Sequence, residues 1–188
     1  MKVLGISGSL RDGSYNTSLL RGASELLPPD VELEHWDGLK AVPPYDEDDD
    51  VQPAPPAVTS LREAIAGADA VLFATPEYNW SVPGVLKNAI DWASRPLASN
   101  PLRNKPVAVI GASTGAFGAV WSQAELRKVL SATGARVLGG ELAVGHAPTR
   151  FDDQGRLVDR ELREQLGEVV AALVAEVAPA PSLLAATA

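Results

Sequence analysis

Three short segments rich in glycine, hydroxyl and amide side chains could together bind a phosphate and a planar heterocycle. The first, residues 8–18 (GSLRDGSYNTS), lies between an apolar run and a helical pattern. A helix that begins here presents free N–H groups at the positive end of its dipole, which suits a phosphate. The candidate ligands are an arginine and short polar side chains: Ser9, Arg11, Ser14, Asn16, Thr17 and Ser18. Taken alone, the segment fits equally well an ordinary loop in which Ser14 or Asn16 only caps the helix.

The second segment, residues 75–84 (TPEYNWSVPG), places an acid, an amide and two aromatic side chains on one short turn. It follows an apolar run and opens another helical pattern, with Ser81 as the expected N-cap and Pro83 in the first turn. Tyr78 and Trp80 could be packing residues only. Aromatic rings, an asparagine and backbone amides at a strand end also suit a flat heterocycle with polar edges.

The third segment, residues 111–118 (GASTGAFG), consists almost entirely of small residues, which allow a ligand to approach the backbone closely. It also matches G-x-S-x-G, the nucleophile turn of many hydrolases, with Ser113 as nucleophile. A hydrolase would need a histidine base and an orienting acid. The chain offers only two histidines and, between Ser113 and the later one, two acids: His35, His146, Glu125 and Glu141. No HGGG-type oxyanion segment is present, so a hydrolase is disfavoured.

Two common phosphate-binding patterns are absent from the chain. No G-x-x-x-x-G-K-[ST] sequence occurs, which argues against a nucleoside triphosphatase, and the glycines do not fit G-x-G-x-x-G, which argues against a dinucleotide-binding Rossmann domain. The predicted phosphate therefore belongs to a mononucleotide.

Alternating strand and helix patterns would position these segments. Apolar runs predict strands at 2–6, 31–36, 70–74 and 106–110, with a weak last strand at 136–138 or 142–144. Helical spacing predicts helices at 16–27, 61–68, 82–93, 123–133 and 160–177. The order predicts an α/β fold, a three-layer doubly wound sandwich around a five-stranded parallel sheet. Ligands of such sheets bind beyond the carboxyl ends of the strands, where the three segments fall.

Length and composition indicate the domain organisation, the partners and the location that we expect. The 188 residues predict one domain over 1–177 and a disordered Ala- and Pro-rich tail over 178–188; the acidic, Pro-rich residues 42–56 are expected to form a solvated loop. A net charge of −8 disfavours nucleic acid and anionic membranes as partners. No signal peptide or membrane-length apolar run is visible and cysteine is absent, so we expect a cytoplasmic location and no cysteine-ligated metal.

The chain resembles the NADPH-dependent FMN reductases, and most closely the branch of chromate, quinone and azo reductases. The resemblance is carried by GSLR at 8–11 with Ser14 and Asn16, PEYN at 76–79 with Ser81, PG at 83–84, and LKNAIDW at 86–92, and it covers about residues 1–175. It implies a flavodoxin-like fold, FMN as cofactor, NADPH or NADH as co-substrate, and a homodimer or homotetramer with the flavin near the subunit interface.

By this resemblance, the FMN phosphate is bound by the first segment and the isoalloxazine by the second and third. The implied cofactor-binding residues are Ser9, Leu10, Arg11, Ser14, Asn16, Thr17, Ser18, Pro76, Glu77, Tyr78, Asn79, Trp80, Ser113 and Gly115. The chain departs from many relatives in two places. Gly118-Ala119, followed by Val120-Trp121, replaces a Gly-Gly pair whose following arginine helps to build tetramers, and Trp80 stands where close relatives often have tyrosine.

The expected activity is a ping-pong reaction in which NAD(P)H reduces the flavin and a small-molecule acceptor (a flavin, quinone, chromate, azo or nitro compound) then takes two electrons. Flavin carries the chemistry, so no side chain is expected to be catalytic and no metal is expected. A flavodoxin-type electron carrier that does not oxidise NAD(P)H is the alternative, disfavoured by Arg11 and by the long second motif. A flavin-binding sensor has no supporting feature in the sequence.

Overall fold

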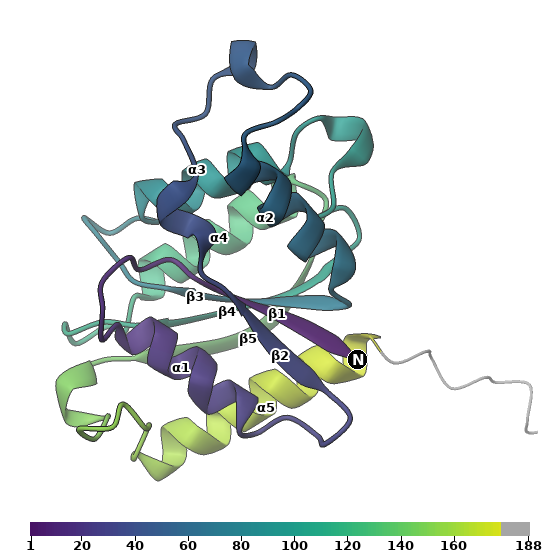
Figure 1. Ribbon diagram of the computed structural model, residues 1–188. Coiled ribbons are helices and arrows are strands. Elements are labelled where there is room, and N and C mark those ends of the chain that lie inside the picture. The colour runs from purple at the N-terminus through teal and green to yellow at the C-terminus, as the bar shows by residue number, and fades with distance from the viewer. Residues whose placement is uncertain (178–188) are drawn as a thin grey trace, which may run out of the picture.

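Five parallel strands form one sheet in the order β2-β1-β3-β4-β5 (Figure 1). The computed structural model describes residues 1–177, and the tail at 178–188 lies outside the described residues. The strands are β1 (Lys2–Ser7), β2 (Glu32–Trp36), β3 (Ala70–Thr75), β4 (Pro106–Ala112) and β5 (Arg136–Val144). The predicted five-stranded parallel sheet is confirmed. The two proposed positions of the last strand are both correct, because β5 includes them in one continuous strand.

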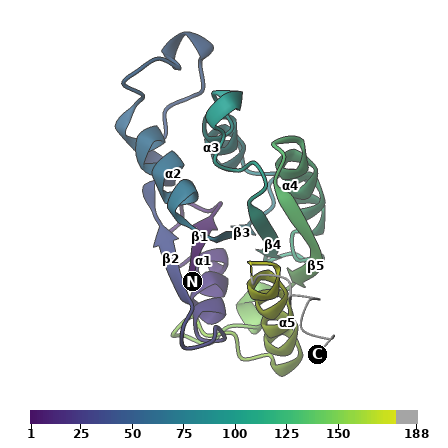
Figure 2. The ribbon, with the colours of Figure 1, turned by 90° about the vertical axis from the view of Figure 1, so that its right-hand side faces the viewer.

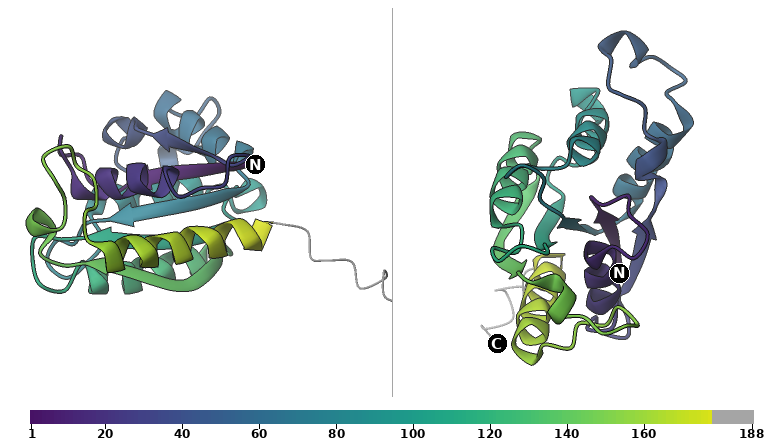
Figure 3. Two further views of the ribbon diagram at one scale, coloured as in Figure 1. Left: turned by 90° about the horizontal axis from the view of Figure 1, so that it is seen from below. Right: turned by 90° about the vertical axis from the view of Figure 1, so that its left-hand side faces the viewer.

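Helices cover both faces of the sheet, as predicted for a three-layer sandwich. On one face lie α1 (Tyr15–Ser24) and α5 (Arg160–Val177), which run side by side in the view from below (Figure 3). On the other face lie α2 (Pro56–Gly67), α3 (Gly84–Ala93) and α4 (Val120–Ala132) (Figure 2). Short 3₁₀ turns complete the connections: η1 (Gly38–Ala41), η2 (Glu47–Asp49), η3 (Leu97–Ser99) and η4 (Ala147–Thr149). Within residues 1–177, no helix has both the length and the apolar character needed to cross a membrane.

The central strands explain why the sheet needs helices on both faces. Every residue of β3 and of β4 is buried, so side chains on both faces of these strands must be covered. On the α1–α5 face, Leu72 and Ile110 pack with Leu20 of α1. Phe73 contributes to the separate core on the α2–α3–α4 face.

Strand register brings the three candidate segments to one edge of the sheet. Ser7 of β1 pairs with Ala74 of β3, and Thr75 of β3 pairs with Gly111 of β4. The connections that follow these strands therefore begin at almost the same height. We call them loop 1 (residues 8–14), loop 2 (76–83) and loop 3 (113–119). Gly8 allows loop 1 to approach loop 2 and α3, since a Cβ there would lie 3.2 Å from Pro76 Cδ and 2.8 Å from Leu86 Cδ2.

Several element boundaries differ from the predicted ones for local reasons. Helix α2 begins at Pro56 rather than at 61, because proline at the first helical position needs no N–H partner. The prediction that Ser81 caps α3 is wrong. That helix begins at Gly84 without a side-chain cap, and the Ser81 hydroxyl donates to Glu125 instead.

The acidic residues 42–56 are exposed at their tip but attached at both ends, so the description as a solvated loop is only partly correct. The segment extends beyond α2 and α3 at one end of the molecule (Figure 2). Asn88 of α3 holds its first part: Nδ2 donates to the Pro43 carbonyl (2.8 Å), and Oδ1 accepts from the Tyr45 N–H (2.7 Å). Asp50 pairs with Arg62 of α2 at 2.9 Å.

We expect Asn88→Ala to release this segment. The substitution leaves the Tyr45 N–H without its acceptor and removes one donor from the Pro43 carbonyl, which should lower the free energy of unfolding by about 1–3 kcal/mol. Urea denaturation measures this loss, and limited proteolysis should show faster cleavage within 42–56. The neighbouring Lys87→Ala is the control, because Lys87 makes only an exposed pair with Asp91. Equal stability and proteolysis of the two variants would contradict the anchoring role.

Candidate functional site

Loops 1, 2 and 3 together enclose a cleft at the carboxyl edge of the sheet. Its volume is about 130 Å³, and it is lined by Ser9, Arg11, Ser14, Tyr15, Asn16, Pro76, Glu77, Tyr78, Ala112, Ser113 and Thr114. We call it the three-loop cleft. Most of these residues were predicted from sequence to contact one ligand, and the fold brings them together from three distant parts of the chain.

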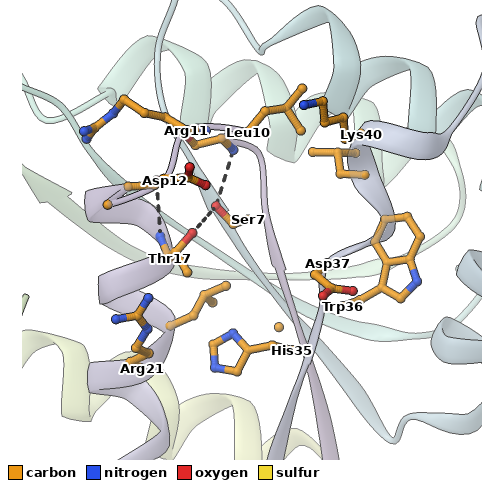
Figure 4. Close-up of a pocket in the computed structure, with 16 residues that line it drawn as sticks. Ser7, Leu10, Arg11, Asp12, Thr17, Arg21, His35, Trp36, Asp37 and Lys40 are labelled. Carbon is orange, nitrogen blue, oxygen red and sulfur yellow. Dashed lines mark hydrogen bonds between the residues drawn. The ribbon is translucent and has the colours of Figure 1, made fainter.

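A larger cleft of about 480 Å³ lies against loop 1 and shares Ser9, Arg11 and Ser14 with the three-loop cleft. The predicted residues Leu10 and Thr17 line it as well. Figure 4 shows Thr17 and Arg21 of α1 on one side of this cleft and Trp36 and Lys40 on the other. Loop 1 is therefore a wall common to two clefts.

The side of the larger cleft formed by β2 and η1 was missed from the sequence. It includes His35, Trp36, Asp37 and Lys40. Their position at the carboxyl end of a strand was the available signal, because that edge of a doubly wound sheet is where ligands bind. Burial, followed by the charge of Arg21, lowers the pKa of His35, so its imidazole is neutral at neutral pH.

Loop 1 leads into the start of helix α1 and contains backbone N–H groups that have no hydrogen-bond acceptor among the described residues. Ser14 caps α1, its Oγ accepting from the N–H groups of Asn16 (3.2 Å) and Thr17 (3.4 Å). The interpretation of Ser14 as a helix cap is thus correct. The cap uses N–H groups of α1 and none of loop 1. Among residues 1–177, no acceptor takes the N–H groups of Asp12, Gly13 or Ser14.

The Arg11 guanidinium is the cation of loop 1. It lies 5.4 Å from the centre of the Tyr15 ring, and no carboxylate within the described part of the chain pairs with it. Its charge is therefore available to an anion at the start of α1, where the helix dipole also favours negative charge.

Asn16 and Ser18, two further predicted phosphate ligands, also make structural contacts. Asn16 is buried and makes two bonds with Ala112 at the end of β4: Nδ2 donates to the carbonyl (3.0 Å) and Oδ1 accepts from the N–H (2.9 Å). This pairing fixes loop 3 relative to the start of α1. Ser18 is buried against Gly155, where a Cβ would lie 2.9 Å from Ser18 Oγ, and it lines neither cleft.

The second and third loops are held together by two carboxylates. Glu77 Oε2 accepts from the backbone N–H groups of Trp121 (3.0 Å) and Ser122 (3.1 Å), the first turn of α4. This side chain caps a helix whose own N-cap residue, Ala119, offers no side-chain acceptor. Glu77 therefore sets the spacing of loops 2 and 3, in addition to lining the three-loop cleft.

Glu125 of α4 makes the matching contact with the far end of loop 2. Its Oε2 accepts from Ser81 Oγ (2.5 Å) and from the Val82 N–H (3.3 Å). The bond from the Ser81 hydroxyl, with that from Val82, lowers the pKa of the Glu125 carboxyl. Because the folded-state pKa is lowered, this contact stabilises the fold above the usual glutamate pKa and is lost as the pH falls through the lowered value.

Loop 3 does not have the contacts of a hydrolase nucleophile. Ser113 Oγ accepts from the Gly115 N–H at 3.2 Å, and within residues 1–177 neither His35 nor His146 hydrogen-bonds it. Gly115 lies just outside the residues that line the three-loop cleft, as do Asn79 and Trp80 at the tip of loop 2. The hydrolase alternative therefore lacks the serine–histidine contact that it requires.

The strand order defines a flavodoxin-like α/β protein, and the three-loop cleft lies where the winding direction of the sheet reverses, the place where such folds bind ligands. The family model for NADPH-dependent FMN reductases matches residues 1–149. This chain belongs to the NADPH-dependent FMN reductase family.

Individual relatives extend the match over most of the chain. An NAD(P)H-dependent FMN reductase of Pseudomonas aeruginosa is 49% identical over 174 residues, which cover 92% of this chain and 93% of that protein. A 2-hydroxy-1,4-benzoquinone reductase of a Burkholderia species is 37% identical over 167 residues, 88% of this chain and 90% of that one. The solved structure of FerB, a flavoenzyme NAD(P)H:(acceptor) oxidoreductase of Paracoccus denitrificans, has a TM-score of 0.82 at 34% identity, covering 94% of this chain and 96% of FerB. The protein is thus an oxidoreductase that uses FMN, with NAD(P)H as electron donor.

The residues of the site fit FMN. Open backbone donors and Arg11 suit its phosphate at loop 1, and the walls of loops 2 and 3 offer a proline, a tyrosine and small residues to a flat ring system. Glu77 and Asn16 hold these walls in place.

We expect Glu77→Ala to loosen loops 2 and 3. It removes the acceptor from two N–H groups at the start of α4, which should lower the free energy of unfolding by about 1–2 kcal/mol. Urea denaturation of the ligand-free protein gives the value. Glu63→Ala, an exposed glutamate of α2, is the matched control and should change stability little. Unchanged stability of the Glu77 variant would show that the cap contributes nothing.

Proposed function

We propose that this protein passes electrons from NAD(P)H, through FMN bound at loops 1–3, to small-molecule acceptors, with quinones as the main class. The observation that carries the proposal is the three-loop cleft, which joins an anion site at loop 1 to aromatic and small-residue walls at loops 2 and 3. The names of relatives, which include a benzoquinone reductase, support quinones as acceptors. Flavin, chromate, azo and nitro compounds are the further acceptors to test.

The proposed roles of the residues follow from their positions. Ser9, Arg11 and the open amides of loop 1 bind the phosphate, and Thr17 and Leu10 border it on the side of the larger cleft. Asn16 acts through Ala112 and positions loop 3. The ring is bordered by Pro76, Glu77 and Tyr78 of loop 2 and by Ser113 and Gly115 of loop 3, while Asn79 and Trp80 stand at its outer rim.

When bound, FMN supplies the electron transfer, and the chain's own residues bind and orient it. The ionisable acid of the three-loop cleft, Glu77, is already bonded to two N–H groups of α4 and is a poor candidate for a proton donor or acceptor. The protein is proposed to work without a catalytic side chain, by holding FMN and by leaving one face of the ring open to both substrates in turn.

We further propose a homodimer in the cytoplasm. Exposed apolar side chains lie on loops 1 and 2 and on the start of α3, and a second copy of the chain would cover them: Leu10, Tyr78 and Val85. The arginine that builds tetramers in many relatives is absent after Gly118-Ala119, which favours the dimer over the tetramer.

The test of the function is direct. The purified protein, loaded with FMN, should show a flavin absorbance that NADPH or NADH bleaches and that a quinone such as menadione restores over many turnovers. Bleaching without rapid reoxidation by menadione, ferricyanide, chromate or free FMN would instead indicate an electron carrier. A protein whose absorbance and melting temperature do not respond to added FMN would exclude both.

We expect Arg11→Ala to weaken FMN binding by roughly ten- to one-hundredfold, because one charge-assisted hydrogen bond contributes about 1.5–3 kcal/mol. Titration of the apoprotein, followed by quenching of flavin fluorescence, gives the dissociation constant. Arg103→Ala is the control, since Arg103 is an exposed arginine near the amino edge of the sheet. The melting temperature of apo Arg11→Ala should stay close to that of the parent. Equal FMN affinity in the two variants would refute the phosphate assignment.

A further inference from the structure

The tip of loop 2 has an unfavourable backbone conformation for its sequence. Tyr78 and Ser81 exchange both backbone hydrogen bonds (3.2 and 3.1 Å), which leaves Asn79 and Trp80 as a two-residue hairpin turn. Both have positive φ, 52° at Asn79 and 64° at Trp80. Such a turn favours asparagine followed by glycine. A residue with a Cβ in the left-handed region costs about 1–2 kcal/mol, so Trp80 is a costly choice at this position.

Burial does not explain why a tryptophan occupies this position, because Trp80 is 71% exposed. Its ring instead stacks on that of Trp121, with centroids 4.8 Å apart and planes inclined by 11°. Phe117 packs edge-on against Trp121 at 4.9 Å. We call Trp80, Trp121 and Phe117 the aromatic stack. One ring face of Trp80 lies against Trp121, and its large exposed fraction leaves the opposite face open to solvent.

The aromatic stack is fixed to the rim of the three-loop cleft. Trp80 follows Tyr78, a wall of the cleft, by two residues, and the hairpin bonds of Tyr78 set its direction. Trp121 donates its N–H to Glu77, another wall residue of the same cleft. The open face of Trp80 therefore has a fixed position relative to the proposed flavin site.

We propose that the open face of Trp80 binds the planar aromatic ring of the electron acceptor, so that the protein prefers fused-ring quinones to compact inorganic acceptors. This inference rests on the proposed function. Stacking of one ring on an aromatic side chain contributes about 0.5–1.5 kcal/mol beyond the area buried, enough for a preference of roughly tenfold together with that area. The open face of Trp80, on a stack attached to the rim of the three-loop cleft, is matched in size to one such planar ring.

The test compares Trp80→Gly with the parent enzyme in the FMN-loaded state. The ratio of kcat/KM for menadione to kcat/KM for ferricyanide, which has no aromatic ring, should fall about tenfold. Trp80→Tyr keeps a planar ring and should retain most of the ratio. Because Asn-Gly is the preferred sequence for this turn, the apo form of Trp80→Gly should also melt at a higher temperature than the parent.

Trp80→Asn is a second variant that controls for effects specific to glycine, because asparagine also tolerates positive φ and lacks the aromatic ring. Its ratio of kcat/KM for menadione to kcat/KM for ferricyanide should fall as it does for Trp80→Gly. An unchanged ratio in both variants would overturn the inference while leaving the proposed function intact. A shift of either variant from dimer to monomer in light scattering would also overturn it, by assigning the aromatic stack to the subunit interface. If the parent enzyme binds FMN but reduces neither acceptor, the proposed function fails and the inference fails with it.

Discussion

Parallel hydrogen bonding between β1, β3 and β4 is the constraint on which the site depends. Their register ends the three strands at nearly one height, so loops that begin at residues 8, 76 and 113 of the sequence start side by side. Two side chains then fix the distances between these loops. Asn16 joins the start of α1 to the end of β4, and Glu77 joins loop 2 to α4. The cleft follows from backbone geometry and from these two bridges.

The sequence predicts the fold well because the central strands leave few alternatives. β3 and β4 are continuous apolar runs that only a sheet covered on both faces can bury, and alternation with helices then sets the topology. The prediction of strand boundaries is less accurate for β5, the strand at one edge of the sheet. β5 is mostly exposed over its first six residues and contains two glycines, and its pairing with β4 shifts register between Val107 and Val109. Arg127 bonds the carbonyls of Val109 and Gly140 across this irregularity, a tertiary contact that no local pattern reveals.

For the site, the sequence identifies the right loops but not the direction of each side chain. Asn16 and Ser18 lie on a helix whose rotation is set by packing, and that rotation turns Asn16 towards β4 and Ser18 towards Gly155. Glu77 is a residue type that often contacts ligands. Its carboxylate instead accepts hydrogen bonds from the start of α4, whose first turn has no capping side chain of its own. The cleft wall formed by β2 and η1 was missed because its residues form no motif and become neighbours of loop 1 only in the folded chain.

The two hydrogen bonds between Asn16 and Ala112 have a consequence for how a nucleotide would be released. They are the same pair of bonds that two neighbouring strands exchange, so the asparagine side chain works as a one-residue strand added to β4 beyond its last pairing with β3, Thr75 with Gly111. The start of α1 and the start of loop 3 are thereby held at a fixed spacing. A cofactor that contacts both would be bound by loops whose spacing is set in advance, which lowers the entropic cost of ordering them on binding and favours a long residence time.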